Sequence, residues 1–367
     1  MGTIAARKTA KGNALRYTAQ IRIKRGGAIV HTEAKTFERK QAAEAWIRRR
    51  ETELSEPGAI GRATTTDVTL SQAIDRYVAE SRKKIGRTKA QVLKAINQYD
   101  IAAMPCAAIK SGDIVAWAKE LSADRKPQTV GNYVSHLAAI FKIARPAWRY
   151  GLDEKAMDDA QTVLRSLGLV AKSDQRDRRP TVEELDRLMR HFADRQIRAP
   201  KSAPMHVIIA FAIFSTRRMD EITRITWREF DAKHRRVLVR DMKHPGQKKG
   251  NDVLVEMPDE ALRIVAIMPR SAEQIFPYKP STITKAFTDA CKLLGIIDLH
   301  FHDLRHEGIS RLFEMGRTIP QAASVSGHRS WHSLQRYTHL REAGDKYAGW
   351  QWLSEIAPQG IGDGALP

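Results

Sequence analysis

Two polar stretches divide the 367-residue chain, and this division limits the folds that it can adopt. The first, SEPGAIGRATTT at residues 55–66, is rich in Gly, Ser, Thr and Pro, and the second, AKSDQRDRRP at residues 171–180, is polar and charged. Such runs are typical of connections between packed segments. A chain of this length is also expected to hold two or three domains. We therefore predict three domains, at residues 1–60, 67–170 and 176–357.

The first segment combines strand and helix patterns. Partial alternation of apolar and polar residues on both sides of Gly26-Gly27, within residues 15–37, predicts a β-hairpin that could belong to a three-stranded sheet. Residues 38–54 then change to a helical period, with Ala42 and Trp46 on one face. We expect a small module of β-sheet plus helix.

The other two segments are dominated by helical patterns. Residues 68–145 are helical almost throughout, which predicts a bundle of about four helices. The third segment opens with Thr181 and Glu184 at capping-box spacing and contains a strand pair, residues 235–242 and 252–257, joined by a Lys- and Gly-rich connection. The predicted fold class is mainly α with small β-sheets (α+β), ending in a mixed, mostly helical domain.

The charge of the chain indicates its partner. The formal net charge is +20 with a pI near 10, and all three segments share the positive excess. This distribution is expected if every domain faces a long polyanion such as double-stranded DNA, although a basic surface without a partner would look the same.

Cys106 and Cys291 are too few for a disulfide framework or a cysteine zinc site. The N-terminus lacks an apolar leader and the apolar run 207–214 is too short to span a membrane, so we expect a cytoplasmic, nucleoid-associated protein.

Three motifs of the last segment carry residues suited to phosphodiester chemistry: STRRMDEI at 215–222, HDLRH at 302–306 and GHRSWHSLQRY at 327–337. Cleavage without a metal needs positive charge on the non-bridging oxygens, a nucleophile and a proton donor for the leaving oxygen. Arginine holds phosphate with two parallel hydrogen bonds, tyrosine can attack through its phenol, and histidine exchanges protons near neutral pH. The chain supplies each of these groups.

The spacing within the motifs supports one site. His302 and Arg305 are three residues apart and share a face if they are helical. His328 precedes Tyr337 by nine residues, which is enough for a helix end, a turn and the start of another helix. Both groups could then reach the same phosphate.

These residues resemble the tyrosine recombinases, also called the phage integrase family. The family pattern has an Arg with a Glu three residues later, a hairpin lysine, His-x-x-Arg, Gly-His and a tyrosine about nine residues further on. The matching residues here, in the same order, are Arg218, Glu221, a hairpin lysine, His302, Arg305, Gly327, His328 and Tyr337. A helical DNA-clamping domain before the catalytic one also fits residues 67–170.

Two departures from the pattern affect the assignments. The family commonly has Thr-Gly-x-Arg in its first motif, whereas this chain has Ser215-Thr216-Arg217-Arg218. Either arginine could hold phosphate, and the offset to Glu221 favours Arg218. The hairpin is also long.

The long hairpin offers three candidate lysines, Lys243, Lys248 and Lys249. Lys243 follows the first strand directly, where the family has its lysine. We therefore predict Lys243 as the catalytic lysine and Lys249 as the alternative.

The resemblance implies a site-specific integrase that cuts and rejoins DNA through a 3′-phosphotyrosyl link on Tyr337. Arg218 and Arg305 would hold the phosphate, Lys243 and His302 would transfer protons, His328 would hydrogen-bond the phosphate, and Glu221 would brace an arginine. It also implies four protomers on two DNA attachment sites, with no metal, ATP or other cofactor. An arm-type DNA-binding role for residues 1–60 suggests integration or excision of a mobile element such as a phage, with DNA-bending or directionality proteins as further partners.

Other interpretations remain for several of these residues. Taken alone, Tyr337 would more often be a core aromatic, and the histidines could be structural or form a metal site, although the carboxylates have no familiar ligand spacing. His306, His332 and His339 match no family position, and we expect them to be structural. A type IB topoisomerase-like activity and a non-catalytic DNA-binding regulator are the alternative functions.

The tail has two interpretations. Trp350 and Trp352 could pack locally or, by resemblance, dock on a neighbouring subunit.

Overall fold

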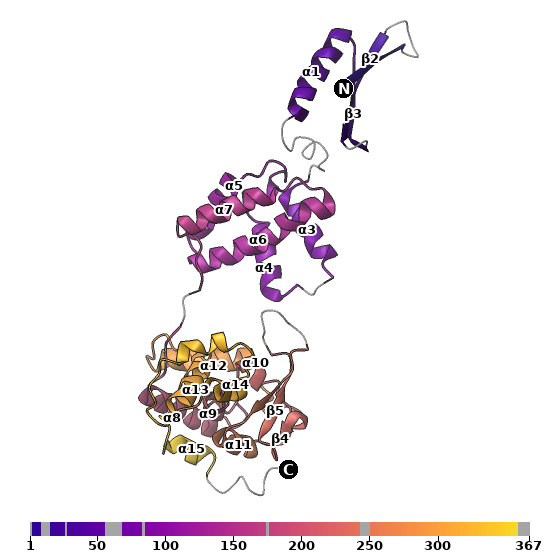
Figure 1. The fold of residues 1–367 in the computed structure, drawn as a ribbon. Coiled ribbons are helices and arrows are strands. Elements are labelled where there is room, and N and C mark those ends of the chain that lie inside the picture. Colours follow the sequence, from indigo (N-terminus) through magenta and orange to yellow (C-terminus); the bar gives the residue numbers. More distant parts are fainter. Residues whose placement is uncertain are drawn as a thin grey trace. The chain divides into compact units, whose positions relative to one another are not determined.

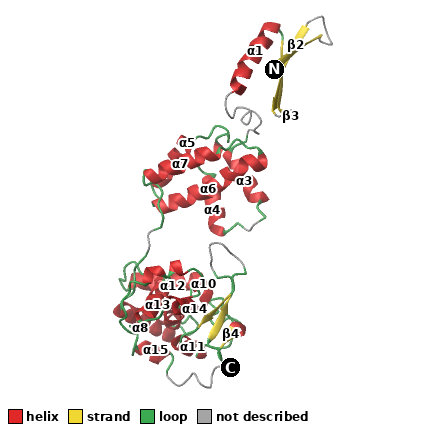
Figure 2. Ribbon diagram, in the orientation of Figure 1, coloured by secondary structure: helices red, strands yellow, loops and turns green. Residues whose placement is uncertain are grey.

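The chain forms two compact units, residues 1–174 and 175–367 (Figure 1). A computed structural model describes residues 2–8, 15–25, 28–55, 68–82, 85–173, 176–242 and 250–358. Helices predominate, and the two sheets are small and antiparallel (Figure 2). The predicted mainly helical α+β class is confirmed.

The N-terminal part of the first unit is a sheet covered by one helix. Strands β1 (Gly2–Lys8), β2 (Leu15–Arg25) and β3 (Ala28–Phe37) pair in the order β1-β2-β3, and α1 (Lys40–Ser55) contacts all three. The small core between sheet and helix consists of Ala19, Ile21, Ala43, Ile47 and Leu54. The β2–β3 pairing was predicted, and the predicted turn at Gly26-Gly27 lies outside the described residues.

The rest of the first unit is a helical bundle. Its helices are α3 (Leu70–Glu80), α4 (Arg87–Ile96), α5 (Ser111–Ser122), α6 (Pro127–Trp148) and α7 (Glu154–Ser166), with a 3-10 turn η1 (Asp100–Ala103). Helix α6 begins with a proline at its first turn, where the missing N–H costs no helical bond. Its apolar face, which includes Val134 and Phe141, is buried against the other four helices. This face was predicted from the helical period.

The second unit holds all three motifs. Its helices are α8 (Val182–Arg198), α9 (Met205–Ser215), α10 (Met219–Ile222), α11 (Asp259–Ala266), α12 (Pro280–Leu293), α13 (Asp303–Glu314), α14 (Ile319–Ser326) and α15 (Gln351–Ile356). The 3-10 turns are η2 (Trp227–Glu229), η3 (Trp331–Ser333) and η4 (Gln335–Tyr337), and the sheet β4-β5-β6 consists of Phe230–Asp231, Arg236–Val239 and Val253–Glu256.

Helix α9 lies at the centre of this unit because it is apolar on every side. All of its residues except His206 are buried, and it contacts α8, α11 and α13. The apolar run 207–214 is therefore a core helix. The predicted capping box of Thr181 and Glu184 is present at the start of α8.

The C-terminal tail packs on the core of its own unit. Trp350, Trp352 and Leu353 are buried in the cluster that contains α9, and the Trp350 indole donates a 2.8 Å hydrogen bond to Asp186. Within the described ranges, no helix combines the length and apolar character that crossing a membrane requires.

Candidate active site

The first motif lies where the central helix α9 ends. Thr216 has a φ of 57°, in the left-handed region, and this residue terminates the helix. A β-branched residue rarely adopts this conformation, which normally favours glycine. The reversal turns the chain so that Arg218 precedes the first turn of α10, while Arg217 points back into the core.

The adjacent arginines have different surroundings. The Arg217 side chain is fully buried, and its guanidinium donates hydrogen bonds to the Ser215 carbonyl at 3.0 Å and to the carbonyl of Val325. Arg218 keeps 24% of its side chain exposed and donates to Glu221 Oε1 at 2.7 Å. Only Arg218 of this pair is therefore accessible to a ligand that arrives from solvent.

Arg305 joins the three motifs. It lies in the first turn of α13, is 3% exposed, and donates to the carbonyl of Thr216 in the first motif and, at 3.0 Å, to that of Ser326 before the third. Its Nη2 also lies 3.4 Å from His328 Nε2. One guanidinium thus fixes the ends of α9 and α14 relative to α13, which brings together residues that are far apart in the sequence.

The three arginines share one buried carboxylate, that of Glu221. Its oxygens lie 2.7 Å from Arg218, 3.7 Å from Arg217 and 3.8 Å from Arg305. Burial acts to raise the pKa of Glu221, but the three positive charges outweigh it and the pKa is lowered. Glu221 is therefore ionised, and it offsets only part of the charge around it.

Burial and the excess of positive charge lower the pKa values of the buried arginines. Burial, with repulsion from Arg218 and Arg217, lowers the pKa of Arg305 to about 9. Burial likewise lowers the pKa of Arg217 to about 10. Both side chains still carry a proton at neutral pH, so the cluster favours a further anion at its exposed edge.

His328 is held next to Arg305 by a constrained glycine. Gly327 has a φ of 72°, and a Cβ there would lie 2.6 Å from the Met242 side chain, so any other residue would be strained at this position. The His328 Nδ1 lies 2.8 Å from the Ser326 hydroxyl. Burial, followed by the charge of Arg305, lowers the pKa of His328 to about 3, and the ring is neutral. Because Arg305 can only donate, Nε2 accepts and the ring proton lies on Nδ1.

His302 is the exposed member of the predicted set. It occupies the N-cap position of α13 and is followed one turn later by His306. The two imidazole rings meet edge to face, with their centroids 5.0 Å apart. Arg305 lies in the first turn after His302, three residues along the chain, and the His302 ring packs against His306.

Tyr337 is buried at the end of the third motif. It lies in η4, is 6% exposed, and stacks on Phe313 of α13 at 5.9 Å between centroids with 17° between the planes. Its hydroxyl lies 2.5 Å from His306 Nδ1. Burial raises the pKa of Tyr337, while Arg336 and Arg305 act in the opposite direction. The tyrosine is therefore protonated and lies within the field of the arginine cluster.

The predicted hairpin lysines fall outside the described part of the chain. Lys243, Lys248 and Lys249 lie between Met242 and Gly250, the last described residues on each side of the connection. Lys243 as the catalytic lysine stays a prediction.

The chain matches the model of the phage integrase family over residues 178–343. It is 32% identical to a shufflon-specific DNA recombinase of Escherichia coli over 305 residues, which span 79% of this chain and 72% of the relative. It is also 27% identical to the integrase of Salmonella phage P22, over 59% of this chain and 55% of that protein. A lambda integrase dimer bound to a COC′ core site has a similar fold, with a TM-score of 0.59 at 19% identity, over 91% of this chain and 94% of that one.

The chain belongs to the phage integrase family of tyrosine recombinases. Membership in this family indicates that the protein cleaves and rejoins DNA strands. At Thr216, where the family commonly has glycine, the backbone of this recombinase has a left-handed conformation that glycine adopts readily and a β-branched residue rarely does.

One contact of the candidate site was missed from the sequence. His306, which we expected to be structural, contacts the hydroxyl of Tyr337. The signal that could have indicated it is its position four residues after His302, on the same helical face. Within the described ranges, no group of three His, Cys, Asp or Glu side chains could hold a metal ion.

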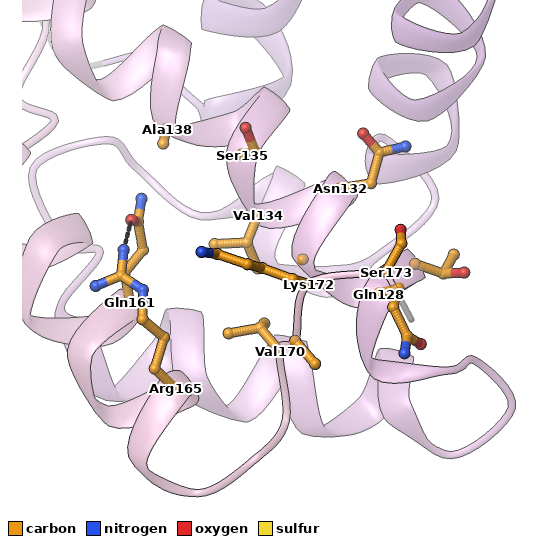
Figure 3. A pocket seen from close by; sticks show the side chains of 13 residues that line it. Gln128, Asn132, Val134, Ser135, Ala138, Gln161, Arg165, Val170, Lys172 and Ser173 are labelled. Atoms are coloured by element: carbon orange, nitrogen blue, oxygen red, sulfur yellow. Dashed lines mark hydrogen bonds between the residues drawn. The ribbon is translucent and has the colours of Figure 1, made fainter. Parts of the chain in front are cut away.

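The helical bundle of the recombinase has a groove of about 770 Å³ between α6, α7 and residues 170–173, with both polar and apolar side chains in its lining (Figure 3). Gln128, Asn132 and Ser135 line it from successive turns of α6, and Lys172 extends into it from the loop beside the start of that helix. Amide, hydroxyl and ammonium groups of this kind can hydrogen-bond base edges and phosphates.

Proposed function

We propose that this protein is a site-specific DNA recombinase that works through a 3′-phosphotyrosyl intermediate. Tyr337 attacks the scissile phosphate and releases a free 5′-hydroxyl, while Arg218 and Arg305 hold the non-bridging oxygens. The observation that carries the proposal is the cluster of three guanidiniums around one carboxylate, with Arg218 exposed at its edge and Tyr337 within its field. A phosphate would supply the missing negative charge, and the charge that develops in the transition state would be stabilised further.

The remaining predicted residues have complementary roles. When phosphate is bound, His328 carries its ring proton on Nε2 and donates it to a phosphate oxygen, which requires the opposite tautomer to the one that accepts from Arg305. Glu221 braces the arginines, and His302 assists proton transfer. Lys243 protonates the leaving 5′-oxygen. Because the phosphotyrosyl link conserves the energy of the phosphodiester, rejoining to a new partner strand requires neither ATP nor a metal ion.

The other parts of the chain bind the DNA that is recombined. The bundle, with its groove lined by Gln128, Asn132 and Lys172, grips the core site, and residues 1–60 bind arm-type sites. Four protomers act on two attachment sites. This assembly is supported by the similar fold of a lambda integrase tetramer bound to a Holliday junction, with a TM-score of 0.57 at 19% identity over 89% of this chain and 95% of that one. The biological outcome is the integration or excision of a mobile element, aided by accessory DNA-bending or directionality proteins.

A suicide-substrate assay tests the chemistry. Wild-type protein and the Tyr337→Phe variant are incubated in EDTA with nicked DNA from the junction that flanks the element, and products are resolved on a denaturing gel. We expect a covalent protein–DNA adduct with wild-type protein and none with the variant, whose DNA binding should be unchanged. Tight binding without an adduct from wild-type protein would instead indicate a DNA-binding regulator.

A second assay distinguishes recombination from relaxation of supercoils. A plasmid with two cognate sites should give deletion or inversion products, and a plasmid with one site should give none. Relaxation of the one-site plasmid by wild-type protein as a monomer would indicate a type IB topoisomerase-like activity and would contradict the proposal.

A further inference from the structure

We infer that His306 is a catalytic residue that takes the phenolic proton of Tyr337 during cleavage and returns it during rejoining. The inference rests on the proposed function, because it assigns a base to the proposed nucleophile. His306 touches the reacting atom itself, since its Nδ1 lies 2.5 Å from the Tyr337 hydroxyl oxygen.

The two rings meet at the edges that carry their polar atoms. Their centroids are 6.2 Å apart and their planes differ by 34°. This separation is close to the largest that a 2.5 Å contact between Nδ1 and the hydroxyl oxygen allows, so the two rings meet edge to edge. The hydroxyl oxygen therefore lies beyond the edge of the imidazole that carries Nδ1, within hydrogen-bond distance of that nitrogen.

Before the reaction, His306 is neutral and Tyr337 is protonated, as a transfer from the phenol to the imidazole requires. Burial, with the charge of His302 next in size, lowers the pKa of His306 to about 4, so the ring is neutral at physiological pH. Burial raises the pKa of Tyr337, so the phenol keeps its proton. A neutral imidazole whose Nδ1 accepts carries its own proton on Nε2, and it can take a second one on Nδ1.

Helix α13 positions Tyr337 next to His306. Two side chains of helix α13 contact Tyr337: Phe313 stacks on its ring, and His306, two turns earlier, lies within hydrogen-bond distance of its hydroxyl. The neighbouring residue Arg305 points to the other motifs. The same helix therefore supplies both a phosphate ligand and the acceptor for the nucleophile's proton.

The proton transfer balances with the cleavage step. As the bond between the Tyr337 oxygen and phosphorus forms, the O–H electron pair moves to oxygen and the proton moves to His306 Nδ1. The bond between phosphorus and the 5′-oxygen breaks. That oxygen keeps the electron pair and receives a proton from Lys243, the donor proposed above. His306 keeps this proton as an imidazolium while the phosphotyrosyl link exists. Rejoining follows the reverse path.

The test uses substitutions that distinguish two roles for His306: a base that takes the proton, and an acceptor that only hydrogen-bonds the phenol. Asparagine at position 306 places an amide oxygen near the position of Nδ1 but cannot take a proton, and alanine removes the group. Single-turnover rates of adduct formation and of rejoining are measured with the full chain at saturating protein for His306→Asn and His306→Ala, the latter with and without added imidazole. His332→Asn, which makes the same change at an exposed histidine, is the matched control.

We expect both His306 variants to cleave and rejoin roughly 100-fold more slowly, in the range of general-base catalysis, with an unchanged thermal midpoint and DNA affinity. Imidazole should restore part of the His306→Ala rate, and His332→Asn should match wild type. A His306→Asn rate close to wild type would show that the histidine only positions the phenol and would overturn the inference, as would faster cleavage by either variant.

Failure of this inference and failure of the proposed function give different results. If wild-type protein forms an adduct that Tyr337→Phe abolishes, and His306→Asn cleaves normally, only the role of His306 is lost. If wild-type protein forms no adduct, the proposed function itself fails.

Discussion

Arg217 and Arg218 are neighbours in the sequence, but the backbone reversal at Thr216 gives them different roles. Arg217 is a buried structural cation that satisfies carbonyl groups, whereas Arg218 keeps an exposed edge beside Glu221. A chemical assay should therefore distinguish them, although the sequence alone allowed either to hold phosphate.

We predict that Arg218→Ala lowers the single-turnover cleavage rate by about 10²- to 10³-fold, as expected for removal of a preorganised donor to the transition state. The thermal midpoint should stay near that of wild type because the side chain is partly exposed. Arg217→Met should instead lower the thermal midpoint, since the Val325 carbonyl and Glu221 lose a buried partner. Equal thermal midpoints with a selective rate loss in Arg217→Met would reverse the two assignments.

A glycine sets the spacing of two central helices. A Cβ at Gly308 of α13 would lie 2.0 Å from the Ile213 carbonyl oxygen of α9, a contact with backbone that cannot give way. Helix α13 carries Arg305 and His306 on its preceding turn, so its close approach to α9 also positions the site.

Gly308→Ala should destabilise the second unit by roughly 3 kcal/mol, at the upper end of the cost of overpacking a core. Hydrogen exchange of peptides from α9 and α13 measures the change locally. Gly112→Ala is the matched control, because a Cβ at this helical position meets nothing within 4 Å and should be neutral or stabilising. Unchanged exchange in Gly308→Ala would show that the two helices can separate at little cost.

The segment that precedes α8 is fastened to α13 by ion pairs. Arg179 donates to both oxygens of Glu307, at 2.6 and 3.2 Å, and pairs with Glu314. Glu307 is fully buried, and it also pairs with Lys346 and accepts a hydrogen bond from the Tyr347 hydroxyl. Burial acts to raise the pKa of Glu307, but Arg179 and Lys346 outweigh it, and the folded-state pKa is lowered.

A carboxylate whose pKa is lowered by folding contributes stability above its unfolded pKa, near 4.3, and this contribution is lost as pH falls through the folded value. Arg179→Met removes the main opposing charge, so the pKa of Glu307 should rise and the loss of stability should begin at a higher pH. We expect roughly 2 kcal/mol of destabilisation at pH 7, less than for an uncompensated buried charge because two partners remain. Urea unfolding between pH 7 and 4 measures both effects, with Arg190→Met on the exposed face of α8 as control. Parallel pH profiles for Arg179→Met and wild type would contradict the pairing argument.

At the scale of the whole molecule, local patterns predicted the elements, and tertiary contacts determined the site. The apolar face of α6 and the capping box of α8 follow from residue types at fixed spacing, so they were predicted. The contact of His306 with Tyr337 joins residues 31 apart and depends on how η4 packs on α13, which no local pattern records. The offset to Glu221 favoured Arg218 over Arg217 in the sequence, whereas the burial of Arg217 and the partial exposure of Arg218 depend on the fold.

The distribution of charge over the molecule leads to a prediction about salt. The net charge of +20 is shared by all segments, so many phosphates should be contacted and binding should release their counterions. We expect the affinity of the full chain for attachment-site DNA to fall by about 10³-fold or more between 50 and 200 mM salt, as six or more phosphate contacts would require. Fluorescence anisotropy measures this slope.

The cleavage step should respond differently to salt. Arg305 and Glu221 are almost fully buried, and mobile ions screen buried charges much less than exposed ones. Once protein is saturating at each salt concentration, the single-turnover rate should therefore change by no more than a few fold, even where the affinity has fallen steeply. A cleavage rate that falls in parallel with the affinity would mean that the arginine cluster is open to solvent ions when DNA is bound. A shallow binding slope would mean that most of the positive surface does not face DNA.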